Sequence, residues 1–198
     1  MYSAYYPAQT SPSIPRSRFM KYALLTLKKM FRYLLKPLSF VPALCMMYLI
    51  YTFSSQPAAV SSEVSIAFGR KLIILANRVL SLELSDPQII YYADLFHALV
   101  RKLAHVTEYF LLAVSVALPL YVYRLRGFAL VLAAGLFCVG FAGLDEYHQT
   151  MVPGRSGALR DVAIDSIGIF AGIYLTRIMG YIGRKTIFAP LSLTHRHE

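Results

Sequence analysis

The sequence is short of charged residues and contains no tryptophan. Asp, Glu, Lys and Arg make up only 15% of its 198 residues, whereas an average globular chain carries roughly a quarter. Hydrophobic residues make up 57%. This composition argues against an ordinary soluble domain and favours a protein that crosses a membrane several times.

Acidic residues are the scarcest of the charged ones, with 10 Asp and Glu against 20 Lys and Arg and a net charge of +10. A basic excess can indicate nucleic-acid binding, but the interleaving of basic and aromatic residues used on RNA and DNA is missing. In so apolar a chain, anionic lipids and orientation in the membrane explain the excess more simply. We expect membrane lipids, and no nucleic acid, as partners.

Cysteine is nearly absent as well. The two cysteines, Cys45 and Cys138, each lie within an apolar run. They provide neither a disulfide framework nor a thiolate metal site. We expect both to be buried and to act as small hydrophobic residues.

The composition divides the chain into four stretches. Residues 1–18 are rich in Pro, Ser and Tyr and lack a hydrophobic period, which predicts a tail that is disordered or docked on a larger membrane protein complex. Residues 19–37 place Lys and Arg among apolar residues, as in a basic amphipathic helix on a membrane surface. Residues 38–183 are the predicted four-span membrane domain, and residues 184–198 are the predicted C-terminal cytoplasmic tail.

Four apolar stretches are long enough, or nearly so, to cross a bilayer, which asks for about 20 residues. They are 38–53, 109–123, 127–144 and 162–182. The amphipathic stretch 58–84 predicts a helix that lies on the membrane or over the bundle. The predicted fold is an all-α, polytopic membrane helical bundle with about four transmembrane helices and one or two amphipathic interfacial helices.

A helix start is expected at Asp86 and Pro87, as the N-cap and the first helical residue. From there the helix can continue through "RKLAHVTEY" into the second span. With the N-terminus in the cytoplasm, four spans return the C-terminus to the same side. Most of the Lys and Arg residues then lie in the cytoplasm, as the positive-inside rule requires.

This topology brings the polar ends of all four spans to the outer side of the membrane. Gln56 follows the first span, "RKLAHVTE" begins the second, "DEYHQ" ends the third, and "RDVAID" begins the fourth. Ionisable residues within a span usually face the bundle interior, are paired and mark function. Asp165, about one turn inside the membrane, is the most informative single residue of this kind.

Residue spacing predicts which of these side chains share a face. Arg101, His105 and Glu108 lie on one side of a helix, because they are four and three residues apart. Asp165 shares a face with Gly168, and that face continues as a row of small residues against which another helix can pack closely. The spacing therefore predicts a polar pocket at the rim of a tightly packed bundle.

The motifs "YTFSSQ", "RKLAHVTEY", "LDEYHQTMVPGR" and "RDVAIDSIG" closely resemble those of the VanZ-like family of bacterial membrane proteins. The resemblance covers about residues 38–182, nearly everything except the two tails. It implies a multi-pass protein of the bacterial cytoplasmic (inner) membrane, for which the positive-inside rule places both termini in the cytoplasm. It also implies a link to resistance against the glycopeptide teicoplanin.

The polar residues favour an enzyme that hydrolyses or transfers a lipid or lipid-linked phosphate. Histidine would act as general base or acid, oriented by a carboxylate, and arginine would bind the phosphate. The predicted catalytic residues are His105, Glu108, Asp145, Glu146, His148 and Asp165. The predicted substrate-binding residues are Gln56, Arg101, Gln149, Arg155, Arg160 and Asp161.

Two alternatives remain open. The His, Asp and Glu residues could also hold a divalent metal, although "HEXXH" is missing; the prediction is for no cofactor, and chelation without loss of activity would dispose of the metal. The protein could instead be a non-enzymatic headgroup-binding or structural subunit of a larger membrane assembly. An enzyme that depends on a histidine should lose activity between about pH 8 and pH 5.

Overall fold

The computed structural model describes residues 36–186 and, before them, residues 20, 24–27 and 30. Residue contacts divide the chain into two units, Met1–Ser39 and Phe40–Glu198. The helices of the second unit are α2 Val41–Ser54, α3 Ala58–Leu80, α4 Asp86–Val122, α5 Gly127–Gln149 and α6 Leu159–Thr186. No strand occurs in the described residues, so the predicted all-α fold is confirmed. Residues 1–18, most of the predicted helix over 19–37 and residues 187–198 lie outside the described residues, while 184–186, the start of the predicted C-terminal tail, belong to α6.

Among the described residues, four helices are long and apolar enough to cross a membrane, as predicted: Lys36–Ser54, Asp86–Val122, Gly127–Gln149 and Leu159–Ile182. The second confirms the predicted continuation, because α4 runs without a break from the polar stretch at Asp86 into the apolar one.

The start of α4 corrects one detail. Ser85, in an extended conformation, is the N-cap, and its N–H donates to Oε1 of Gln88 at 2.9 Å. This capping box satisfies a helix-end N–H group that would otherwise lack a partner. The prediction of Asp86 as the N-cap was therefore wrong by one residue.

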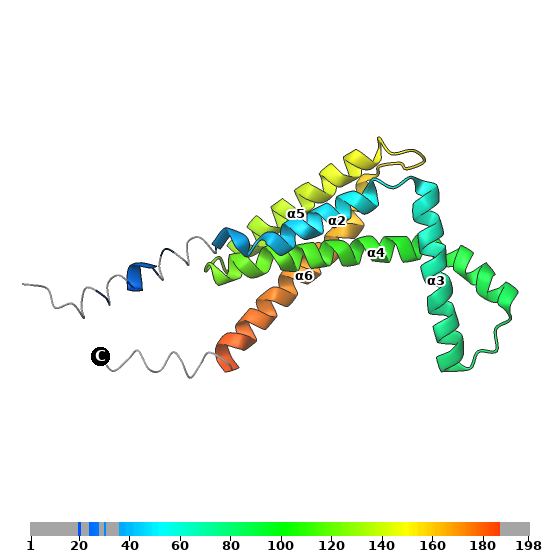
Figure 1. Ribbon diagram of the computed structural model, residues 1–198, viewed down its shortest axis with the longest axis horizontal. Helices are drawn as coiled ribbons and strands as arrows, with labels where there is room; N and C mark the ends of the chain where they lie inside the picture. Colours follow the sequence, from blue (N-terminus) through cyan, green and yellow to red (C-terminus); the bar gives the residue numbers. More distant parts are fainter. Residues whose placement is uncertain (1–19, 21–23, 28–29, 31–35, 187–198) are drawn as a thin grey trace, which may run out of the picture. The chain divides into compact units, whose positions relative to one another are not determined.

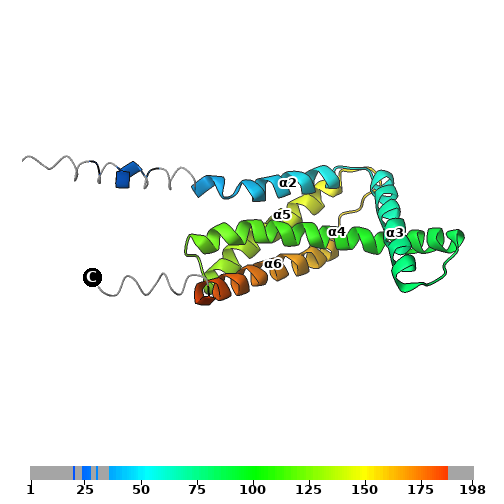
Figure 2. The same cartoon turned by 60° about the horizontal axis from the view of Figure 1, so that its bottom comes forward.

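Helices α2, α4, α5 and α6 run side by side as a bundle, and α3 crosses α4 near one end of it (Figures 1 and 2). The most extensive packing is between α4 and α6. A Cβ atom at Gly168 would collide with the carbonyl oxygen of Val106, and one at Gly172 would lie 2.6 Å from the carbonyl oxygen of Phe110. The predicted close helix approach along this face of α6 is confirmed, and it brings the beginning of α6 against the middle of α4.

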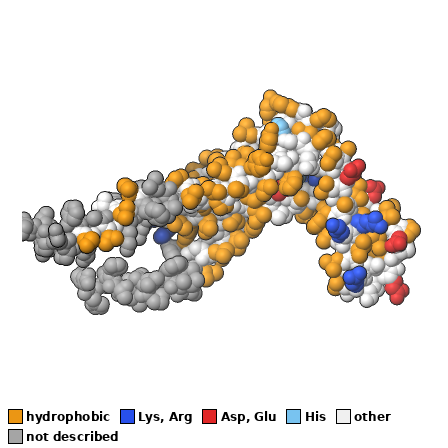
Figure 3. Space-filling view, in the orientation of Figure 1, with side chains coloured by type: hydrophobic (Ala, Val, Ile, Leu, Met, Phe, Trp, Pro, Cys, Tyr) orange, Lys and Arg blue, Asp and Glu red, His pale blue; other side chains and the backbone are white. Residues whose placement is uncertain are grey.

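The outer surface of the bundle is largely apolar, as expected for helices that face lipid (Figure 3). Charged side chains gather instead over α3 and the beginning of α4 (Figure 3). Cys138 lies in the core, as predicted, but Cys45 is exposed. The apolar run around Cys45 was read as buried in protein, whereas one face of a lipid-exposed helix has no protein cover.

Candidate functional site

A cavity of about 260 Å³ opens at the end of the bundle where α2 and α5 end and α3 and α6 begin. Every helix except α2 contributes side chains to its wall, and so does the loop between α5 and α6. The polar ones are Ser62, Arg101, Lys102, His105, Glu146, Gln149, Arg155, Ser156, Asp161 and Asp165. The predicted polar pocket at one rim of the bundle is therefore present in the structure.

The loop between α5 and α6 is held against its neighbours by backbone bonds. Gly154 has φ +75°, a conformation that favours glycine, and Pro153 next to it accepts a hydrogen bond from the N–H of Ala58 at 3.2 Å. At the other end of the loop, the N–H of Ala158 donates to Oε1 of Glu146 at 2.7 Å. These bonds place Arg155 in the wall of the cavity.

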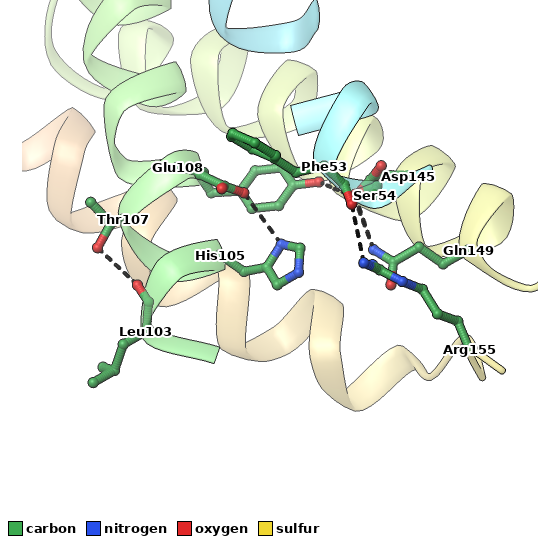
Figure 4. A network of polar contacts seen from close by, with 10 residues as sticks. Phe53, Ser54, Leu103, His105, Thr107, Glu108, Asp145, Gln149 and Arg155 are labelled. Carbon is green, nitrogen blue, oxygen red and sulfur yellow. Dashed lines mark hydrogen bonds and ion pairs between the residues drawn. The ribbon is translucent and has the colours of Figure 1, made fainter. Parts of the chain in front are cut away.

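Arg155 has an N–H group that donates no hydrogen bond to a described residue. Its Nη2 donates to the carbonyl oxygen of Phe53 at 3.1 Å (Figure 4), while its buried Nε has no hydrogen-bond partner among the described residues. Burial, and next the charge of Arg101, lower the pKa of Arg155 from its usual value. An arginine nevertheless stays charged in proteins, so the cavity wall carries a cation with an unused N–H group.

His105 and Glu108 lie one turn apart on α4, as their spacing predicted. Nδ1 of His105 is 3.4 Å from Oε2 of Glu108 (Figure 4), but neither buried atom makes a hydrogen bond with a described residue. Of the two, only His105 lines the cavity. Glu108 is thus placed to orient the imidazole, and His105 to meet a ligand.

Asp145 is the centre of a hydrogen-bond network behind the cavity (Figure 4). Its Oδ2 accepts from Ser54 Oγ at 2.8 Å, from the hydroxyl of Tyr109 at 3.0 Å and from Nε2 of Gln149 at 3.1 Å. The donors come from α2, α4 and α5. Asp145 therefore ties three helices together and is not in the cavity lining.

Three carboxylates line the cavity, and each has a different environment. Glu146 is bound by the backbone N–H of Ala158. Asp161 pairs with Lys102, and both side chains are about two-fifths exposed. Asp165 is buried, with only 6% of its surface exposed, and no hydrogen bond joins it to another described side chain. Of the three, Asp165 has the carboxyl group most available to a ligand.

Several predicted site residues lie elsewhere. His148 packs its ring 5.0 Å from that of Tyr51, Arg160 is exposed and Gln56 is half-buried, and none of the three lines the cavity. The sequence places all of them near the outer rim, but the direction of each side chain depends on how its helix is rotated in the bundle.

Two residues of the site are missing from the predicted set. Lys102 lines the cavity and pairs with Asp161. Tyr109 is fully buried and donates to Asp145. For Tyr109 a signal was available, since it follows His105 by one helical turn and so faces the same interior.

In the described part of the chain, no group of three or more His, Cys, Asp or Glu side chains is arranged to hold a metal ion. The predicted acidic and histidine residues are instead divided between the cavity, the Asp145 network and the Tyr51 contact, with Glu108 behind His105. The site thus offers separate hydrogen-bonding groups and charges.

A model of the VanZ/LLP1 family matches residues 39–180. The chain belongs to the VanZ/LLP1 family. The matched range contains the four spanning helices, apart from a few residues at the start of the first and at the end of the fourth, and every residue of the cavity wall. No curated protein and no solved structure matches the chain. Membership in the VanZ/LLP1 family confirms the resemblance seen in the sequence motifs.

Proposed function

We propose that the cavity binds the phosphate of a lipid or lipid-linked molecule and hydrolyses or transfers it at the outer face of the bacterial cytoplasmic membrane. The observation that carries the proposal is Arg155, whose buried Nε lacks a partner at the cavity wall. A buried N–H group without an acceptor costs roughly 1–3 kcal/mol. A phosphate oxygen is an acceptor that suits the guanidinium in charge and geometry.

Two cations of the cavity wall are available to a phosphate. Arg101 and Arg155 are the two wall cations that no described carboxylate pairs with, since Lys102 is paired with Asp161. Arg101 makes only a long contact of 3.5 Å with Ser62. The two guanidinium groups can therefore bind the anion from two sides.

The catalytic groups proposed are His105 and Asp165. His105 accepts a proton from the attacking water or hydroxyl as its oxygen forms a bond to phosphorus. The bond from phosphorus to the leaving oxygen breaks, and protonated Asp165 gives that oxygen its proton. Transfer of the proton from His105 to Asp165 restores the site, and Glu108 orients the imidazole throughout.

A lipid-phosphate activity at this face fits the link to teicoplanin resistance that the family resemblance implies, because it would alter the cell envelope on which a glycopeptide acts. We propose the orientation that the positive-inside rule gives, with both termini in the cytoplasm and the cavity outside.

A second candidate is headgroup binding without turnover, in a structural subunit of a larger membrane assembly. The observation in its favour is the Asp145 network, which joins three helices and is the kind of buried lock that a structural protein needs. Turnover of a lipid phosphate by the purified protein separates the two candidates.

Binding tests the proposal, with Arg155→Gln compared against Arg160→Gln in nanodiscs. The probes are phosphatidic acid and a polyprenyl phosphate. Removing a charged donor from the wall should weaken binding about tenfold or more, while the exposed Arg160, outside the wall, should change it less than twofold. Because Arg155 also contacts Phe53, thermal unfolding of both variants is the control for folding. Equal affinities in the two folded variants would refute the proposal.

A further inference from the structure

Helix α3 has an apolar face that no other part of the described chain covers. Its residues recur every three or four positions along the whole helix, and each is between 44% and 70% exposed: Val60, Val64, Phe68, Leu72, Leu75 and Val79. A row of that spacing occupies one side of a helix. Six large apolar side chains in a row on a water-facing helix would be unusual.

The packed face of α3 is a different one. Ser65 and Gly69 are its only buried residues, and a Cβ at Gly69 would lie 3.7 Å from Val100 of α4. These small residues let α3 approach α4 closely. The exposed apolar row is therefore not needed for the contact with α4.

Away from the apolar row, α3 carries a polar strip between further apolar residues. Glu63, Arg70 and Asn77 are seven residues apart and lie on one side of the helix. Lys71 and Arg78 lie at the border between this side and the apolar row. Cations beside an apolar face are the arrangement of a helix in a membrane interface, where they meet anionic headgroups.

The course of α3 agrees with that placement. Only three residues separate the end of α2 at Ser54 from the start of α3 at Ala58, so α3 begins where a spanning helix leaves the bilayer. It then runs across α4 in both views (Figures 1 and 2). Because α4 crosses the membrane, a helix that lies across α4 runs along the membrane surface. Hydrophobic side chains follow the edge of α3 turned toward the bundle (Figure 3).

We propose that α3 docks on the lipid headgroup layer of the same membrane through its apolar row, with Lys71 and Arg78 binding anionic headgroups. Ala58 and Ser62, in the first turns of α3, line the polar cavity. Docking therefore sets the cavity mouth at the level of lipid headgroups, where a lipid phosphate reaches it sideways from the membrane. This placement of α3 does not depend on what the cavity does.

Spin-label accessibility tests the placement in the full chain. Cys45 and Cys138 are replaced by Ala, and single labels are placed at Phe68→Cys and Leu75→Cys on the apolar row and, as matched controls, at Glu63→Cys and Arg70→Cys on the polar side. The protein is studied in nanodiscs of phosphatidylcholine and phosphatidylglycerol. Labels in the row should favour collision with oxygen over a water-soluble nickel chelate several-fold more than the control labels do.

Equal oxygen-to-nickel ratios on the two sides would overturn the proposal, because the row would then face water. Labels in the row that are shielded from both reagents would also overturn it, since that result indicates a second copy of the chain on this face. The charge component has its own variant, the double substitution K71Q and R78Q. It should lower the ratio in the row in anionic discs and leave it unchanged in discs of phosphatidylcholine alone; no change in the anionic discs would refute the charge component.

Discussion

The two ends of the bundle contain hollows of nearly the same size and opposite chemistry. The polar cavity is about 260 Å³, and a groove at the other end is about 280 Å³. The groove is lined by Phe40, Ala43, Leu44, Met47, Val116, Leu120, Ala133 and Phe137, all of them apolar. Both α4 and α5 contribute to the two hollows, so the difference lies in which residues each end of these helices carries.

The polar cavity and the apolar groove offer a ligand different sources of binding energy. In the groove, only apolar contact is available, and lipid tails offer the same contact elsewhere. In the cavity, a ligand can satisfy charged and unpaired groups such as Arg155 and His105. A selective site is therefore expected at the polar end, and substitutions at the two ends should differ in kind.

The largest expected effect is on turnover, from His105→Gln. Loss of a general base typically lowers a rate about 10²–10⁴-fold, while stability should hold because the imidazole Nδ1 makes no hydrogen bond with a described residue. Phosphate release from lipid phosphates and thermal unfolding measure the two quantities. Wild-type activity should also fall as pH decreases from about 8 to about 5. Full activity of the variant would contradict the assignment of His105.

Next in size is the loss of stability from Asp145→Ala. This substitution leaves the donors of Ser54, Tyr109 and Gln149 without their acceptor. It should lower the free energy of unfolding by about 2–4 kcal/mol. The matched control is Asp161→Ala, which breaks a partly exposed ion pair worth about 0–1 kcal/mol. Thermal unfolding in detergent compares them, and equal losses would show that Asp145 is not a structural lock.

A smaller loss is expected from Gly168→Ala. The added methyl group collides with the carbonyl oxygen of Val106 and forces α4 and α6 apart, which costs about 1–3 kcal/mol. Gly140→Ala is the control, because nothing lies within 4 Å of a Cβ there. If Gly168→Ala unfolds at the same temperature as Gly140→Ala, the close contact between α4 and α6 is wrong.

The smallest effect is expected at the apolar end, from Met47→Leu. The swap nearly conserves volume and chemistry in the groove, so it should cost less than about 1.5 kcal/mol and leave turnover unchanged. A large loss of turnover here would mean that the two ends are not chemically separate.

The fold followed from the sequence because lipid imposes a simple rule on composition. A spanning helix must be apolar over its length, so four such stretches predicted the four spans. The row of Gly168 and Gly172 on α6 predicted close helix packing for the same kind of reason. An apolar run does not show which of its residues face lipid and which face the protein core. Cys45 is exposed and Cys138 is buried, although both lie in such runs.

The sequence predicted which residues lie near the site, but not which of their side chains line the cavity. Spacing placed His105 and Glu108 together on α4, and topology brought Arg155 to the same rim. Which side chain enters the cavity depends on the rotation of each helix, and this rotation is set by packing partners that are far away in sequence. For this reason His148 and Arg160 lie outside the cavity, and Lys102 inside it.

The most direct test of lipid phosphate binding at Arg155 is a measurement of the distance from phosphorus to a guanidinium nitrogen. Solid-state NMR of the protein in nanodiscs, with ¹⁵N-labelled arginine and bound polyprenyl phosphate, reports the separation of phosphorus from guanidinium nitrogen. A hydrogen-bonded phosphate places these nuclei within about 4 Å of each other, and the signal should be lost in Arg155→Gln and kept in Arg160→Gln. A phosphate that shows no arginine nitrogen within that distance, or a signal that persists in Arg155→Gln, would contradict the account.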